Sequence, residues 1–115
     1  MQLLTKEIRK QIPALNSQEH VSDPTCHVKF FAPWSTWTWY VIEASAVGHW
    51  SDCTIARQVK GDLLFFGYVV GPFPELGSFS LKELLSVIGP MGLKIERDIS
   101  FRPTPLSEVK KLHSS

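Results

Sequence analysis

The 115-residue sequence lacks the features that would place it in a membrane, secreted or strongly charged class of protein. Its 12 basic and 11 acidic residues give a net charge of +1, so no global field would draw it to nucleic acid or to an anionic membrane. No stretch approaches the roughly 18 apolar residues of a spanning helix, and MQLLTKEIRKQI lacks the apolar run of a secretory signal. We therefore expect a cytoplasmic protein without membrane contact.

Cysteine is scarce, since the chain holds only Cys26 and Cys53, and in a reducing compartment both are expected to be free thiols. A zinc site needs four converging ligands, whereas the adjacent Cys26 and His27 would point to opposite faces of a strand. The sequence also has no nucleophile elbow, phosphate-binding glycine loop or H-E-x-x-H motif. We expect no metal, no cofactor and no catalytic residues.

Aromatic and apolar runs separated by turn residues are what the sequence does contain. The stretch HVKFFAPWSTWTWYVIE predicts a strand over Cys26–Ala32, a turn, and a second strand over Trp37–Ser45. A further run, Leu63–Val70, predicts a third strand, and Glu75–Phe79 a short edge strand. Between the second and third strands, the segment Ala46–Asp62 has no clear hydrophobic period, which predicts a long arm. The second strand is apolar on both sides, which is typical of a central strand.

Capping residues mark the expected helices. Thr5 precedes an amphipathic helix that Pro13 ends, and Ser80 with Glu83 forms a capping box for a helix over Leu81–Ile88.

The remaining segments complete one domain. Leu93–Phe101 alternates as a strand, and Thr104 with Pro105 is expected to start a last helix. The fold class predicted is α+β, a single domain over 1–115 with a mixed or mainly antiparallel sheet of four to five strands and two to three short flanking helices.

The order of these segments resembles a known family. The segments are LLTKEIRKQIP, HVKFFAP, WTWY with Glu43, DLLFFGYVVG, ELGSFSLKEL, GPMGLKIERD and FRPTPLSE. They resemble small bacterial proteins catalogued as a domain of unknown function and carried on plasmids, conjugative elements and other mobile DNA. The resemblance implies an accessory protein of mobile DNA and brings no known activity, cofactor or catalytic residue. Trp34 in the turn and the long arm depart from the family pattern.

Aromatic side chains are the main candidates for a binding surface. They are Trp34, Trp37, Trp39, Tyr40, Trp50, Phe66 and Tyr68. Such rings anchor protein interfaces, which predicts a protein partner or a homodimer. They also stack on bases, but Lys29, Arg57, Lys60 and Arg102 are the only nearby basic residues, so nucleic acid is the less supported partner. The alternative is that these rings simply form the core.

Charged residues give a second set of candidates. Alternation places Glu43 on the same strand face as Trp37 and Trp39, where Arg97 is expected to be its partner in a buried ion pair. Glu96 and Asp98 project from one strand face about 7 Å apart. Together with Glu43 they are the carboxylates that a small metal-dependent hydrolase would use, which is the alternative to a binding module.

Overall fold

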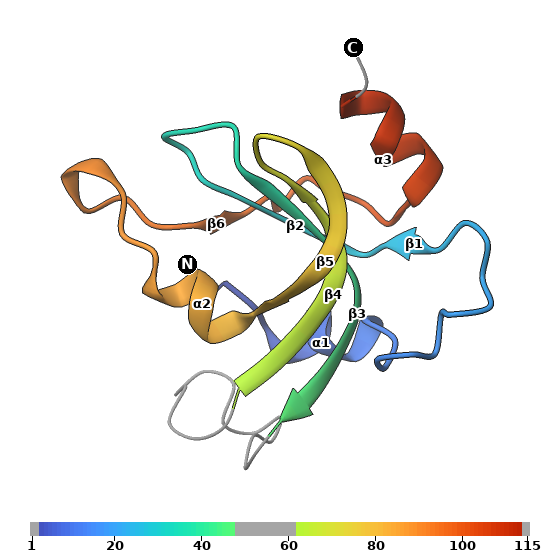
Figure 1. The fold of residues 1–115 in the computed structure, drawn as a ribbon. Helices are drawn as coiled ribbons and strands as arrows, with labels where there is room; N and C mark the ends of the chain where they lie inside the picture. The colour runs from blue at the N-terminus through green and yellow to red at the C-terminus, as the bar shows by residue number, and fades with distance from the viewer. Residues whose placement is uncertain (1–2, 48–61, 114–115) are drawn as a thin grey trace.

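An antiparallel sheet of five strands organises the computed structural model, which describes residues 3–47 and 62–113 (Figure 1). The strands are β1 (Thr25–Cys26), β2 (Val28–Phe31), β3 (Thr38–Val47), β4 (Asp62–Val70), β5 (Pro74–Ser80), β6 (Glu96–Arg97) and β7 (Thr104–Pro105). The helices are α1 (Lys6–Gln11), α2 (Leu81–Ser86) and α3 (Leu106–His113), with a 3₁₀ turn η2 (Pro90–Gly92). The main sheet has the order β5-β4-β3-β2-β6, and β1 pairs with β7. This arrangement confirms the predicted α+β class.

The hairpin predicted from the aromatic stretch is formed by β2 and β3, in which Phe30 lies opposite Trp39. β4 then pairs with β3 and β5 with β4, all antiparallel. Thr38 lies opposite Val70, so the β2–β3 turn and the β4–β5 turn meet at the same end of the sheet. β3 and β4 extend into the predicted arm, whose residues 48–61 lie outside the described residues.

The two faces of this sheet are covered differently. On the face we call the closed face, Phe30, Val41 and Phe65 pack with side chains from α2 and from the segments flanking α1. On the opposite or open face, Tyr40 and Tyr68 pack under α3. Alternation along β2 and β4, and along the first half of β3, places successive side chains on these two faces, as the sequence pattern predicts.

Two helices begin where their caps predict. The Thr5 hydroxyl accepts a hydrogen bond from the Ile8 N–H at 3.2 Å, and the Ser80 hydroxyl accepts one from the Glu83 N–H at 3.1 Å. Each bond satisfies a backbone donor that has no partner within its own helix. α2 is shorter than predicted because Val87 is already extended, which leaves Ile88 on the surface.

The third helix is capped differently from the prediction. Thr104 donates its hydroxyl hydrogen to the Arg102 carbonyl and does not cap the helix. Instead the Asp23 carboxylate accepts hydrogen bonds from the Ser107 N–H at 2.8 Å and from its hydroxyl at 2.7 Å. Those two bonds lower the pKa of Asp23. The helix start is thus fastened to a segment distant in sequence.

The strand predicted over Leu93–Phe101 is largely absent. Only Glu96–Arg97 pairs with β2, while Ile95 alone of the expected inward residues is fully buried. Ile99 is 75% exposed because the chain turns after Asp98, whose carbonyl and carboxylate accept hydrogen bonds from the next residues. The apolar residues of this segment alternate in the sequence, but most of them do not pack against the core, so the alternation does not produce a long strand.

A β-bulge interrupts β3 between Val41 and Glu43. The extra residue, Ile42, shifts the alternation, so Glu43 lies opposite Phe66 on the open face. The prediction that Glu43 shares a face with Trp37 and Trp39 is therefore wrong. Gly67 lies opposite Val41, where a Cβ would overlap the Tyr40 carbonyl oxygen. The bulge thus brings two backbones together at a point where only glycine fits.

Among the described residues, no helix has the length and apolar character needed to cross a membrane.

Candidate functional site

The structure separates the predicted aromatic residues into distinct environments. Tyr40 and Tyr68 are 1% and 7% exposed and belong to the open-face core. Phe66 lines a cavity on the open face, and Trp50 lies outside the described residues. The three remaining tryptophans gather at the turn end of the sheet. The predicted surface is therefore smaller than the full aromatic set.

Trp34, Trp37 and Trp39 surround a shallow hollow of about 310 Å³, which we call the tryptophan hollow. Its lining residues are Ala32, Trp34, Ser35, Trp37, Trp39, Val87 and Ile95. The rings of Trp37 and Trp39 stack with centroids 5.8 Å apart and an interplanar angle of 24°. Trp37 is 40% exposed. Because none of the lining side chains is charged, this site suits a neutral, apolar group.

Two glycines lie against tryptophans of this hollow. A Cβ on Gly71 would run into the ring of Trp37, and one on Gly89 would run into the ring of Trp34. The Trp37 ring therefore packs against the backbone of Gly71, and the Trp34 ring packs against the backbone of Gly89. The tryptophans stand out in the sequence, whereas the two glycines belong to turns distant from them and are not marked by any local pattern.

Large exposed apolar side chains lie in the two turns that contain these glycines. Phe73, beside Gly71, is 81% exposed, and Ile88, beside Gly89, is 67% exposed. Met91 is 99% exposed and has the left-handed backbone angles φ 58° and ψ 26°. A non-glycine residue in this conformation costs about 1 kcal/mol or more. Exposed apolar clusters of this kind are typical of interaction surfaces.

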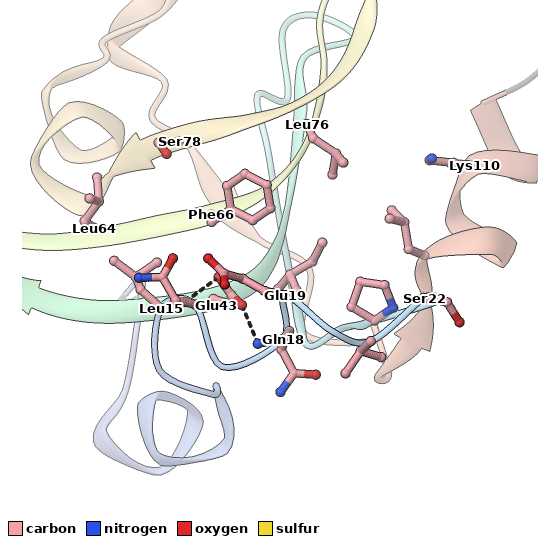
Figure 2. A pocket seen from close by; sticks show the side chains of 15 residues that line it. Leu15, Gln18, Glu19, Ser22, Glu43, Leu64, Phe66, Leu76, Ser78 and Lys110 are labelled. Carbon is pink, nitrogen blue, oxygen red and sulfur yellow. Dashed lines mark hydrogen bonds between the residues drawn. The ribbon is translucent and has the colours of Figure 1, made fainter.

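A larger cavity, of about 620 Å³, lies on the open face (Figure 2). Its floor consists of paired side chains from β3, β4 and β5, among them Glu43, Phe66 and Ser78. One wall is the 15–24 segment and the other is α3, which contributes Leu106 and Lys110. Ligand cavities usually have this size and a mainly apolar lining with few polar groups.

Glu43 is the most buried charged residue of this cavity, at 5% exposure. One carboxylate oxygen accepts the Asn16 N–H at 3.1 Å and the other accepts the Gln18 N–H at 2.7 Å (Figure 2). Asn16 is left-handed, with φ 69°. The carboxylate therefore orders a tight turn of the 14–18 segment. Within the described part of the chain, no basic side chain forms an ion pair with Glu43.

The predicted ion pair between Glu43 and Arg97 is wrong. Arg97 lies opposite Phe30, which pairs with Trp39, whereas Glu43 lies farther along β3 beyond the bulge. The Arg97 guanidinium donates instead to the Leu3 carbonyl at 3.0 Å. Arg97 thus fixes the N-terminal segment, and Glu43 fixes the 14–18 turn.

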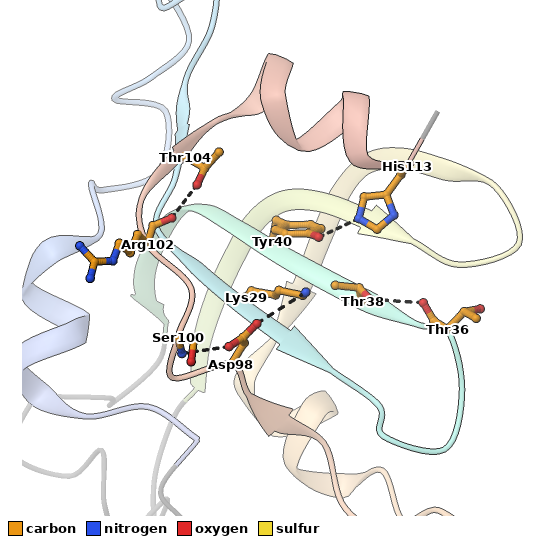
Figure 3. Close-up of polar contacts among 9 residues, drawn as sticks. All are labelled: Lys29, Thr36, Thr38, Tyr40, Asp98, Ser100, Arg102, Thr104 and His113. Atoms are coloured by element: carbon orange, nitrogen blue, oxygen red, sulfur yellow. Dashed lines mark hydrogen bonds and ion pairs between the residues drawn. The ribbon is translucent and has the colours of Figure 1, made fainter. Parts of the chain in front are cut away.

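The carboxylates proposed for a hydrolase are not brought together. Asp98 pairs with Lys29 at 3.6 Å and accepts the Ser100 N–H at 2.9 Å (Figure 3). Glu96 lies opposite Phe31 at the sheet edge, and Glu43 lies on the open face. In the described ranges no three metal-binding side chains converge. Glu96 and Asp98 line one hollow beside Lys29, whereas Glu43 lines a different cavity, so the three carboxylates do not share a site.

A buried contact between Tyr40 and the last turn of α3 was not predicted. The Tyr40 hydroxyl and the His113 Nε2 lie 2.7 Å apart (Figure 3). Burial raises the pKa of Tyr40 to about 12 and, with a contribution from Lys29, lowers the pKa of His113. Tyr40 and His113 therefore share a hydrogen bond between two neutral side chains. This bond ties α3 to the sheet.

Cys26 is buried in the same core as a free thiol. Burial raises its pKa to about 12, so the nucleophilic thiolate is not formed near neutral pH.

Comparison with curated proteins and with solved structures found no significant match. A family model does match, over residues 3–113, and its description is a protein of unknown function, DUF2958. The role on mobile DNA that the resemblance implies stays a prediction. Because the match covers nearly the whole chain, with its hairpin, sheet and helices, the protein belongs to the DUF2958 family of proteins of unknown function.

Proposed function

We propose that the protein is an interaction module that docks another protein surface at the tryptophan hollow. The observation that carries this proposal is the stacked pair Trp37 and Trp39, which is partly exposed in a hollow without charged lining residues. Aromatic rings give large contact areas at low entropic cost, and such residues dominate binding energy at protein interfaces.

A second copy of the chain is the occupant that fits best. Gly71 and Gly89, which lie against Trp37 and Trp34, belong to the turns that present the exposed side chains of Phe73 and Met91, and such side chains suit an uncharged hollow. In a two-fold dimer each copy presents the same patch, so a projection beside a hollow can fill the partner's hollow. Methionine adapts its shape to such apolar surfaces. Self-association through this end would cover side chains that are otherwise exposed to water.

Light scattering coupled to size exclusion, over a concentration series of the full chain, tests this proposal. We expect a dimer at high concentration, and we expect Phe73→Ser and Met91→Ser to shift it to monomer. Neither side chain is part of the core, so both variants should fold normally. Ile99→Ser, which changes an exposed apolar residue in another turn, is the matched control and should remain dimeric.

A wild-type chain that stays monomeric at every concentration would remove the second copy as the occupant. A dimer that survives both substitutions would show that the contact lies elsewhere.

A further inference from the structure

The open-face cavity is a second site, separate from the tryptophan hollow. α3 packs on this face through Leu106 and Val109, which contact the cluster around Tyr40 and Tyr68. The helix therefore covers only the part of the face near these tyrosines. Beyond the helix, Phe66 and Leu76 line the cavity, and Leu76 is 46% exposed. The floor is therefore a preformed apolar surface between the helix and the 15–24 segment (Figure 2).

The cavity floor also contains a charge that the protein only partly neutralises. Each Glu43 oxygen accepts one backbone N–H, but an ionised carboxylate has about four acceptor positions. Its described partners are neutral amides. Burying a carboxylate is costly unless a cation or further donors compensate it. A cationic ligand would supply both a positive charge and further hydrogen-bond donors.

We propose that this cavity binds a small organic cation, with an ammonium or guanidinium group donating to Glu43 and an apolar body against Phe66 and Leu76. The charges of the lining favour a cation over an anion, since Glu19 adds a second carboxylate and Lys110 is the one basic residue among the described lining residues. The Lys110 ammonium lies 6.0 Å from the ring centroid of Tyr68. A volume of about 620 Å³ accommodates a ligand of drug size.

Amide chemical shifts of the full chain, titrated with 2-phenylethylammonium, test this inference. We expect saturable shifts at Gln18, Phe66 and Leu76, with a Kd of about 1 mM or lower. The neutral 2-phenylethanol and the anionic phenylacetate have the same ring and should bind at least about tenfold more weakly, because they lack the charge-assisted donor.

A substitution at Ser78 separates charge recognition from the role of Glu43 in folding. Ser78 is exposed and lies in register with Phe66, which pairs with Glu43, so two strand spacings of about 5 Å separate Ser78 from Glu43. In Ser78→Arg a guanidinium can cross the Phe66 ring and occupy the cation position. We expect this variant to lose binding of 2-phenylethylammonium. Ser78→Gln is the uncharged control and should keep it.

Any of three results would overturn the inference. The first is the absence of saturable shifts in the cavity of the wild-type chain, and the second is equal affinity for the charged and neutral probes. Continued binding by Ser78→Arg with an unchanged Kd would also overturn it. None of these results bears on the tryptophan hollow, which lies at the turn end of the sheet and is tested by oligomeric state.

Discussion

The closed face and the open face of the sheet differ in how completely they exclude water. On the closed face Phe65 is fully buried and contacts Phe30 and Phe79, with ring centroids 5.8 Å and 5.4 Å apart. On the open face the next residue, Phe66, lines a cavity. Two adjacent phenylalanines of one strand thus belong to different environments. Phe65 is packed inside the core, whereas Phe66 borders open space.

The difference follows from what covers each face. The closed face receives side chains from α2 and from both flanks of α1, whereas the open face receives α3 and a turn held by Glu43. Short helices cover only a limited area of a five-stranded sheet. The uncovered part of the open face becomes the cavity.

The sharpest test of this comparison is to truncate the two adjacent rings. Phe65→Ala should lower the free energy of unfolding by about 4 kcal/mol, because it leaves a cavity among packed rings. Phe66→Ala should lower it by about 1 kcal/mol, since its ring already borders open space. Urea denaturation of both variants measures the difference. Equal losses would mean that the two faces are packed alike.

A second test addresses the bulge that places Glu43 on the open face. Gly67→Ala should cost about 3 kcal/mol, because the new methyl group overlaps the Tyr40 carbonyl and forces the strands apart. Gly77→Ala is the matched control, since a Cβ there meets nothing within 4 Å and the edge strand should tolerate it within about 0.5 kcal/mol. Urea midpoints of the two variants give the comparison, and a neutral Gly67→Ala would contradict the close approach.

A third test measures what Glu43 contributes to the open face. Glu43→Gln keeps one acceptor oxygen but turns an amide group toward a backbone donor, so we expect a loss of about 2 kcal/mol. Hydrogen exchange at Asn16 and Gln18 should become faster, while the closed face is unchanged. Glu75→Gln, on the exposed edge strand, should change stability by less than about 0.5 kcal/mol. Unaltered exchange in the 14–18 turn would show that other contacts hold it.

The smallest expected effect is a pH dependence of the open face. Burial lowers the pKa of His113 in the folded protein, so the unfolded chain binds a proton more readily and protonation favours unfolding. The contribution of His113 to stability is therefore complete above about pH 6.5 and declines as the pH falls below that value. Burial lowers the pKa of His27 as well, with the same sign.

Urea unfolding at neutral pH and near pH 5 tests this dependence. His113→Gln should reduce the difference between the two conditions by less than about 1 kcal/mol, because the side chain is only partly buried. His27→Gln should remove a separate part of the pH dependence of the unfolding free energy. A variant lacking His113 that keeps the full wild-type dependence would assign the effect to other groups.

Local signals predicted much of the fold. The caps at Thr5 and Ser80 start helices as expected, and the aromatic hairpin, the third strand and the edge strand all form. These features depend on neighbours within a few residues. Capping bonds and alternation are short-range properties, so they can be read without knowing the fold.

Features that depend on distant contacts were not predictable. Glu43 changed face because of one extra residue at Ile42, which no local pattern marks. Asp23 caps a helix that starts at Leu106, and Gly71 supports Trp37 from another turn. Sequence reasoning found the tryptophans of the hollow but missed the cavity, because strands, helix and turn build it jointly. It also expected a long last strand where the chain turns at Asp98.

The hydrogen bonds between Asp23 and Ser107 hold α3 in place, and α3 is the last element of the chain to be synthesised. α3 follows every strand of the main sheet in the chain, so it leaves the ribosome after them. Until it emerges and docks, Tyr40 and Tyr68 have no helix over them. In a nascent chain the closed face would thus be packed while the open face still exposes its tyrosines. Chaperones would therefore bind the open face.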